Sequence, residues 1–145
     1  MTRTVERRRA LTVLPLLVAS VLVAAGCLAA PTGFQKATSD AASTFLAAAA
    51  TLRLRHEDKL TRTYVVASFE NYRDALRGVP ERLPTLDGAP GSPIVERLAR
   101  LHQDAWPALS EPCLDERCEW RAQLAALERA GSVYLSAAEE GASAR

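Results

Sequence analysis

A stretch of 44 residues, 34–77, contains neither glycine nor proline and is rich in alanine, leucine and arginine. These three residue types favour helices. Thr38 or Ser39 is a candidate N-cap, with Thr32 as an earlier alternative. No strand-like alternation of useful length occurs in the chain, so an all-α fold is expected. The apolar residues of the first half recur mostly at steps of three and four, the helical period: Phe34, Ala41, Ala42, Phe45, Ala48, Ala49 and Leu52.

The stretch is expected to form two helices rather than one. Continuing the seven-residue spacing of the first stripe meets charged residues at Arg55, Lys59 and Arg62. A single helix of this length would measure about 66 Å, too long for so small a domain. We therefore expect a break within 55–63. The second apolar stripe, followed by glycine and proline stop signals, is Val65, Val66, Phe69, Tyr72 and Leu76.

Two further helices are expected in the second half. Residues 80–93 contain four prolines and two glycines and predict a turn-rich linker. Ser92 and Pro93 predict the N-cap and first residue of a third helix, which Pro107 is expected to end or kink. Asp115 is the expected N-cap of the fourth helix. The two apolar stripes are Ile94, Val95, Leu98, Leu101, Ala105 and Leu109, and then Trp120, Leu124, Leu127, Gly131, Tyr134 and Ala138.

Four amphipathic helices pack most simply as an antiparallel, up-down four-helix bundle around one core. The expected domain covers residues 34–139, and the small, polar tail 140–145 is expected to fray. A chain of 145 residues with 48% hydrophobic and 24% charged residues fits one globular domain.

The N-terminal segment has the layout of an export signal. The first nine residues carry four arginines and one glutamate, and residues 10–35 carry no charge. Within that run, residues 11–23 are strongly apolar, and the small residues 24–26 precede Cys27. This order of charge, apolarity and small residues predicts translocation across a membrane.

Residues Val23-Ala24-Ala25-Gly26-Cys27 resemble the lipobox of bacterial lipoproteins, with Ala24 where leucine is commonest. The resemblance implies that residues 1–26 are a signal peptide, that Cys27 receives a diacylglycerol, and that residues 27–33 are a lipidated tether. The new amino group is often acylated in that family. An uncleaved membrane anchor or plain secretion is the alternative, because about 20 apolar residues suffice to span a bilayer.

Lipidation would place the domain on the extracytoplasmic face of the cell membrane, because two or three acyl chains hold a protein there stably. Leu28, rather than aspartate, after the lipidated cysteine resembles lipoproteins sent to the outer membrane of two-membrane cells. The tether reaches at most about 20 Å when extended. The membrane is thus the first expected partner.

An oxidising compartment also predicts a disulfide between Cys113 and Cys118. Residues five apart in an ideal helix lie about 8–9 Å apart, beyond the roughly 7 Å limit for a bridge. The chain between these cysteines is therefore expected to turn.

The charge balance argues against nucleic acid as a partner. Residues 27–145 keep 14 basic and 16 acidic residues, a net charge near −2. A nucleic-acid binder would show a basic surplus or a clustered basic face.

Two groups of side chains invite a chemical interpretation. The run from His56 to Lys59 joins an imidazole to two carboxylates, which acid–base chemistry can use, but a solvated turn is favoured. His102 with Asp104, or with the cysteine pair, suggests zinc ligation, but no fourth ligand is evident and the disulfide is favoured. We therefore predict no catalytic residue, no metal site and no cofactor.

Trp106 and Trp120 flank the cysteine loop. They are expected to form an apolar lid on one end of the bundle, or alternatively a partner-binding surface, because tryptophan is frequent in interface hot spots. Tyr64, Tyr72 and Tyr134 are expected at half-buried boundary or core positions, with the lining of a ligand cavity as the alternative.

The favoured function is that of a non-catalytic, membrane-tethered helical module that binds an envelope protein or another envelope component. One alternative is a carrier or sensor of a small ligand held between the helices. Another is an envelope enzyme that uses the His56 cluster.

Overall fold

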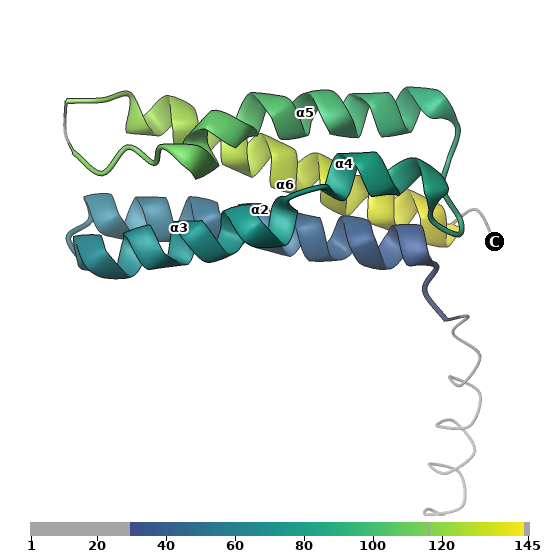
Figure 1. Ribbon diagram of the computed structural model, residues 1–145, viewed down its shortest axis with the longest axis horizontal. Coiled ribbons are helices and arrows are strands. Elements are labelled where there is room, and N and C mark those ends of the chain that lie inside the picture. Colours follow the sequence, from purple (N-terminus) through teal and green to yellow (C-terminus); the bar gives the residue numbers. More distant parts are fainter. Residues whose placement is uncertain (1–29, 116, 144–145) are drawn as a thin grey trace, which may run out of the picture. The chain divides into compact units, whose positions relative to one another are not determined.

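The computed structural model (Figure 1) describes residues 30–115 and 117–143. Within this part the chain forms helices and turns without strands, which confirms the all-helical prediction. Every element belongs to one compact unit that begins at Pro31. The elements are α2 (Gly33–His56), α3 (Arg62–Leu76), α4 (Val79–Arg82), the 3-10 helix η2 (Leu83–Thr85), α5 (Ser92–Ser110) and α6 (Trp120–Ser143).

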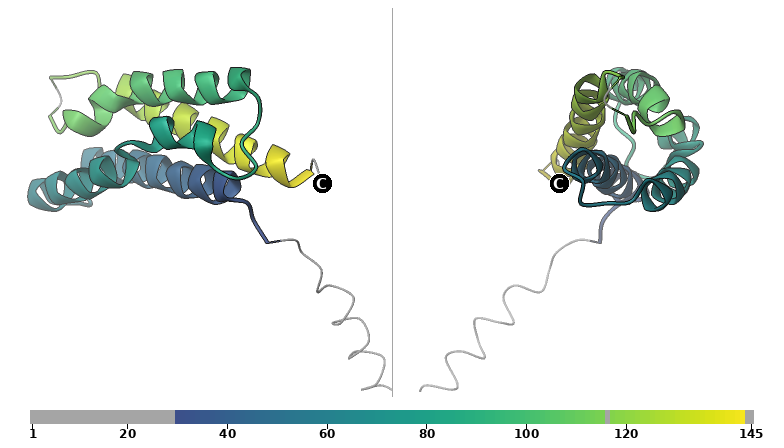
Figure 2. Two further views of the ribbon diagram at one scale, coloured as in Figure 1. Left: turned by 45° about the vertical axis from the view of Figure 1, so that its right-hand side comes forward. Right: turned by 90° about the vertical axis from the view of Figure 1, so that its left-hand side faces the viewer.

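The four longer helices pack together around a shared apolar core. α2 contacts α6 most extensively and also α3, while α5 contacts both α6 and α3. Figure 2 (right) shows these helices end on, gathered about a common centre. Most residues of the predicted stripes are buried there, although Val66 and Ile94 stay exposed. The largest fully buried side chains are Tyr134, Phe34, Phe45, Phe69, Leu52, Leu76, Leu83, Leu98, Leu109, Leu127, Val65 and Thr38.

Helix α2 begins at the earliest of the three predicted caps. The Thr32 hydroxyl accepts a hydrogen bond from the Gln35 N–H at 3.2 Å, and the Gln35 side chain accepts one from the Thr32 N–H at 2.9 Å. This reciprocal capping box satisfies backbone donors that the first turn leaves unpaired. Thr38 is instead a core residue, whose buried hydroxyl donates to the Phe34 carbonyl at 2.8 Å.

The predicted break between the first two helices is confirmed. α2 ends at His56 and α3 begins at Arg62. Asp58 between them has a φ of 55°, a left-handed conformation that a continuous helix excludes. Thr61 then caps α3 by accepting a hydrogen bond from the Tyr64 N–H at 3.3 Å.

Three predicted boundaries are wrong. The segment 80–93 is not only a linker, because α4 and η2 cover its first part and bury Val79 and Leu83 against the core. Of the two outcomes predicted for Pro107, an end or a kink, the end is wrong, because α5 runs on to Ser110 and Ala108 and Leu109 continue its buried stripe. Residue Gly91 rather than Ser92 is its N-cap, and Pro93 still lies in the first turn.

Asp115 does not cap the last helix either. α6 begins five residues later, at Trp120, because the disulfide loop occupies the intervening chain. The Asp115 carboxylate instead accepts a hydrogen bond from Arg62 at 3.1 Å. At its other end α6 extends to Ser143, into the tail that was expected to fray.

No helix of the described part is both long enough and apolar enough to cross a bilayer.

Candidate functional site

A pocket of about 370 Å³ lies between the α3–α4 turn and α5, and Trp106 forms part of its wall. We call it the Trp106 pocket. Its size is within the range of about 300–1,000 Å³ that is typical of small-molecule sites. The lining residues are Arg77, Gly78, Pro80 and Glu81 from the turn and α4, and His102, Gln103, Trp106 and Pro107 from α5.

The turn at Gly78 creates one wall of this pocket. Gly78 has a φ of 69°, a left-handed conformation that glycine adopts without a steric penalty. Pro80 then occupies the first turn of α4, where a missing N–H costs nothing. The Glu81 carboxylate lies over the turn, since a Cβ placed on Gly78 would be 3.9 Å from Glu81 Oε2. The turn thus sets a carboxylate opposite α5.

His102 forms the inner wall, with only 5% of its surface exposed. Its ring stacks on the Trp106 indole with centroids 5.5 Å apart and meets Phe45 edge to face at the same distance. The Nδ1 atom lies 3.5 Å from the Tyr134 hydroxyl, and that hydroxyl donates to the Leu98 carbonyl at 3.4 Å. A polar chain therefore leads from the pocket into the core.

Burial and one nearby charge set the protonation of this pair. Burial lowers the pKa of His102, and the negative charge of Glu81 opposes that shift in part. Burial, with a further contribution from Glu81, raises the pKa of Tyr134 above its ordinary value. Near neutral pH the pocket therefore has a neutral imidazole and a neutral phenol behind it, and a carboxylate at its α4 wall.

The two tryptophans for which the sequence predicts a lid or a partner-binding surface each stack on a different histidine. Trp106 stacks on His102, and Trp120 stacks on His56 with ring centroids 4.3 Å apart and planes 9° apart. The Arg121 guanidinium lies 4.9 Å from the Trp120 ring centroid. Trp106 and Trp120 thus belong to separate clusters, one in the pocket and one beside the cysteine loop.

The cysteine loop turns as predicted. The sulfurs of Cys113 and Cys118 lie at disulfide-bonding distance, with Cα atoms 5.8 Å apart. The Cys113 carbonyl lies 2.8 Å from His56 Nε2, and the Cys113 N–H donates to the Gln123 side chain at 2.7 Å. These bonds connect the loop to the end of α2 and to the start of α6.

The other predicted candidates lie elsewhere. In the His56 cluster, Lys59 pairs with Glu57 at 2.6 Å, and both side chains are exposed. Tyr64 is exposed, whereas the Tyr72 hydroxyl is hydrogen-bonded to Thr51 at 3.0 Å. Within the described ranges, three or more histidine, cysteine and acidic side chains never gather closely enough to hold a metal.

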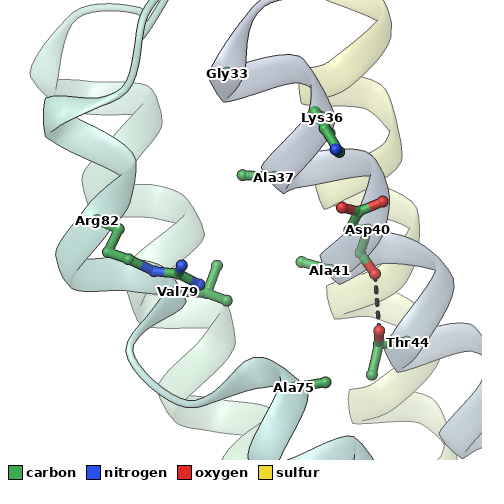
Figure 3. Close-up of a pocket in the computed structure, with 9 residues that line it drawn as sticks. All are labelled: Gly33, Lys36, Ala37, Asp40, Ala41, Thr44, Ala75, Val79 and Arg82. Carbon is green, nitrogen blue, oxygen red and sulfur yellow. Dashed lines mark hydrogen bonds between the residues drawn. The ribbon is translucent and has the colours of Figure 1, made fainter.

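A second pocket, of about 350 Å³, lies between α2 and the α3–α4 segment (Figure 3). In this view the Arg82 guanidinium extends from α4 toward α2, where Lys36 and Asp40 lie. Arg82 Nε donates to the Gly78 carbonyl at 3.2 Å. All three charged side chains are exposed. The Trp106 pocket, with its buried histidine, is therefore the better candidate site.

Sequence reasoning did not identify this pocket. It selected Trp106 and His102 for other reasons and did not select Arg77, Glu81 or Gln103. The only local signal was the glycine and proline after α3, which predicted a helix end but not its packing against α5. Cys27 lies outside the described residues, as does the whole of residues 1–26. Comparisons of the chain with protein-family models, curated proteins and solved structures gave no match.

Proposed function

We propose that this protein is a lipid-anchored module on the extracytoplasmic face of the cell membrane, attached through Cys27, that binds an envelope partner without catalysis. The observation that carries the proposal is the order of residues 1–27: basic, apolar, small and then cysteine. An up-down antiparallel arrangement of the four helices is part of the proposal, supported by the pairing of α2 with α6 and α3 and of α5 with the same two helices.

The position of the folded unit supports this proposal. The compact unit begins at Pro31, four residues after Cys27, and its first helix is capped at Thr32. Four extended residues span at most about 14 Å. The domain would therefore act close to the lipid surface, where an envelope protein is the natural partner.

The aromatic cluster beside the cysteine loop is the proposed partner surface. Trp120 is only half-buried, and its ring contacts both the His56 ring and the Arg121 guanidinium. A rigid, partly exposed indole with a cation beside it resembles the anchors that dominate interface energies. Trp106 would contribute to partner binding from its pocket.

The test compares wild type with Cys27→Ser in the native cell, after cross-linking in intact cells. We expect the wild type in the membrane fraction with a reproducible cross-linked partner that Trp120→Ala loses, and Cys27→Ser without a diacylglycerol and with residues 1–26 still attached. Tyr64→Ala, at another exposed aromatic residue, is the matched control and should keep the partner. A Cys27→Ser chain that is still cleaved after residue 26, or repeated cross-linking without a partner above background, contradicts the proposal.

Carriage or sensing of a small ligand is the second candidate function. The observation that favours it is the Trp106 pocket, in which a buried imidazole, a carboxylate and an indole line one volume of about 370 Å³. Small-molecule sites typically combine such apolar walls with a few convergent polar groups.

A further inference from the structure

We propose that the Trp106 pocket binds a small organic cation, with its charged nitrogen between the Glu81 carboxylate and the Trp106 indole. The inference rests on the second candidate function, ligand binding in this pocket, and names the chemical class of the ligand. It does not depend on the lipid anchor.

The first support is the Glu81 carboxylate, a negative charge that faces the pocket. Glu81 lines the pocket, and its charge is felt at both His102 and Tyr134, which lie behind the inner wall. The ion pairs of the described residues involve other carboxylates, and Glu81 belongs to none of them. Glu81 is exposed, so its carboxylate is accessible and could form a charge-assisted hydrogen bond with a ligand that carries a positive nitrogen.

The second support is the state of the other charged and polar groups. Arg77 is the only other charged residue among those lining the pocket, and its Nη2 donates to the Asp74 carboxylate at 3.2 Å. The Arg77 guanidinium is thus bound to a carboxylate that does not line the pocket. His102 is neutral near neutral pH, because burial lowers its pKa, so it does not repel a cation.

The third support is the aromatic wall. A cation over the face of an indole is attracted by the ring's quadrupole, and the indole face that is not stacked on His102 is the one a ligand would use. Trp106 is half-buried and held in place by its stacking on His102. Pro80 and Pro107 add apolar surface that suits a hydrocarbon body on the same ligand. A six-membered ring with one ammonium group fits this volume and chemistry.

The test titrates the full chain, in non-ionic detergent micelles at pH 7, with three probes of one shape by calorimetry. Cyclohexylamine is protonated at this pH, cyclohexanol is neutral and cyclohexanecarboxylate is negative. We expect cyclohexylamine to bind about tenfold or more tightly than cyclohexanol, and the carboxylate to bind more weakly than either.

Variants assign the effect to the pocket. Glu81→Gln should weaken cyclohexylamine binding about tenfold and leave cyclohexanol unchanged, since the side chain keeps its shape and loses its charge. Trp106→Leu should weaken the binding of both cyclohexylamine and cyclohexanol. Glu70→Gln, an exposed carboxylate on α3 outside the pocket, is the matched control and should behave as the wild type. Circular dichroism verifies that each variant is folded.

The outcomes separate the inference from the candidate function beneath it. If cyclohexylamine and cyclohexanol bind equally, and both lose binding in Trp106→Leu, the pocket remains a ligand site. The proposal that its ligand is a cation is then contradicted. An unchanged affinity of Glu81→Gln for cyclohexylamine would also contradict the proposal that the ligand is a cation. If none of the probes binds, both the inference and the ligand-carrier candidate fail, while the anchor at Cys27 remains untouched.

Discussion

His102 and Tyr134 are buried polar residues in a core that is otherwise mostly apolar. Tyr134 is fully buried and directs its hydroxyl toward the Leu98 carbonyl and His102. Burying a polar group is costly unless it finds a partner. The pair satisfies this requirement in its neutral form, and a proton added to His102 would place a charge in a poorly solvated position.

Acidification should therefore destabilise the protein partly through His102. The folded pKa of His102 is lowered, so below its ordinary value of about 6.5 the unfolded chain binds more protons than the folded one. Its contribution to the free energy of unfolding is intact above that value and declines as pH falls, by at most about 1.4 kcal/mol per pH unit. Urea denaturation from pH 7.5 to 5.5 should show a shallower slope in His102→Gln. An identical slope in both proteins would contradict this account.

Two glycines with a left-handed backbone conformation allow a matched comparison of alanine substitutions. Gly78 and Gly88 have φ values of 69° and 74°, but only at Gly88 would a Cβ collide, at 2.5–2.7 Å, with the side chain of Thr32. Gly78→Ala should cost about 1–2 kcal/mol from its conformation alone. Gly88→Ala should cost about 1 kcal/mol more, because it also displaces the α2 cap. Chemical denaturation compares the two, and equal losses would show that Thr32 moves freely.

At the scale of elements, the contact between α2 and α6 depends on small residues. The buried face of α2 is rich in alanine, and Gly131 on α6 faces it. A Cβ at Gly131 would lie 2.7 Å from Leu46 Cγ and 3.3 Å from the Ala42 carbonyl oxygen. A glycine in a helix interior costs about 1 kcal/mol relative to alanine. The close approach of the two helices explains why the position holds one.

A double-mutant cycle tests this contact. Gly131→Ala alone should give no net stabilisation, because the clash with Leu46 offsets the gain in helix propensity. In a Leu46→Ala background the same substitution should be more favourable than in the wild type, with a gain of at most about 1 kcal/mol, because the Leu46 side chain is gone while the Ala42 carbonyl oxygen remains at 3.3 Å. The coupling energy from thermal or chemical unfolding is the readout. Additive effects would place Leu46 away from Gly131 in solution.

The sequence was sufficient to predict those helix boundaries that depend on local signals. The break after His56 was predictable because charged residues interrupt the buried face, and Thr32 was at least a candidate cap. The start of α6 was not predictable, because Asp115 is a good local cap but the cysteine loop determines where the helix can begin. At this point the covalent constraint of the cysteine loop, and not the local capping preference of Asp115, determines where the helix starts.

The Trp106 pocket was not predictable for a related reason. Glu81 and His102 come together only because the Gly78 turn folds α4 against α5. No periodicity links two residues 21 positions apart across a chain reversal. Pro107 was expected to end or kink α5 from its own chemistry, and the helix does not end there because the side chains that follow it are buried. Tertiary packing decided both cases.

At the scale of the whole molecule, the cysteine pair joins the end of α5 to the start of α6 across a short loop. Closing a ring this small is expected to stabilise the fold by about 2 kcal/mol through the unfolded chain. A reductant should therefore lower the unfolding midpoint of the wild type and leave that of Cys113→Ala/Cys118→Ala unchanged. A wild-type midpoint that does not respond to reductant would show that the bond is absent or contributes nothing.

The proposed function depends on the chain's being exported and lipidated at Cys27, since the proposed compartment and the proposed envelope partner both follow from that event. Mass spectrometry of the protein isolated from its native cells measures this directly. We predict that the first residue is Cys27, with a diacylglycerol on its sulfur, and that residues 1–26 are absent. A chain that still begins at Met1 and has a free thiol at Cys27 would contradict the account.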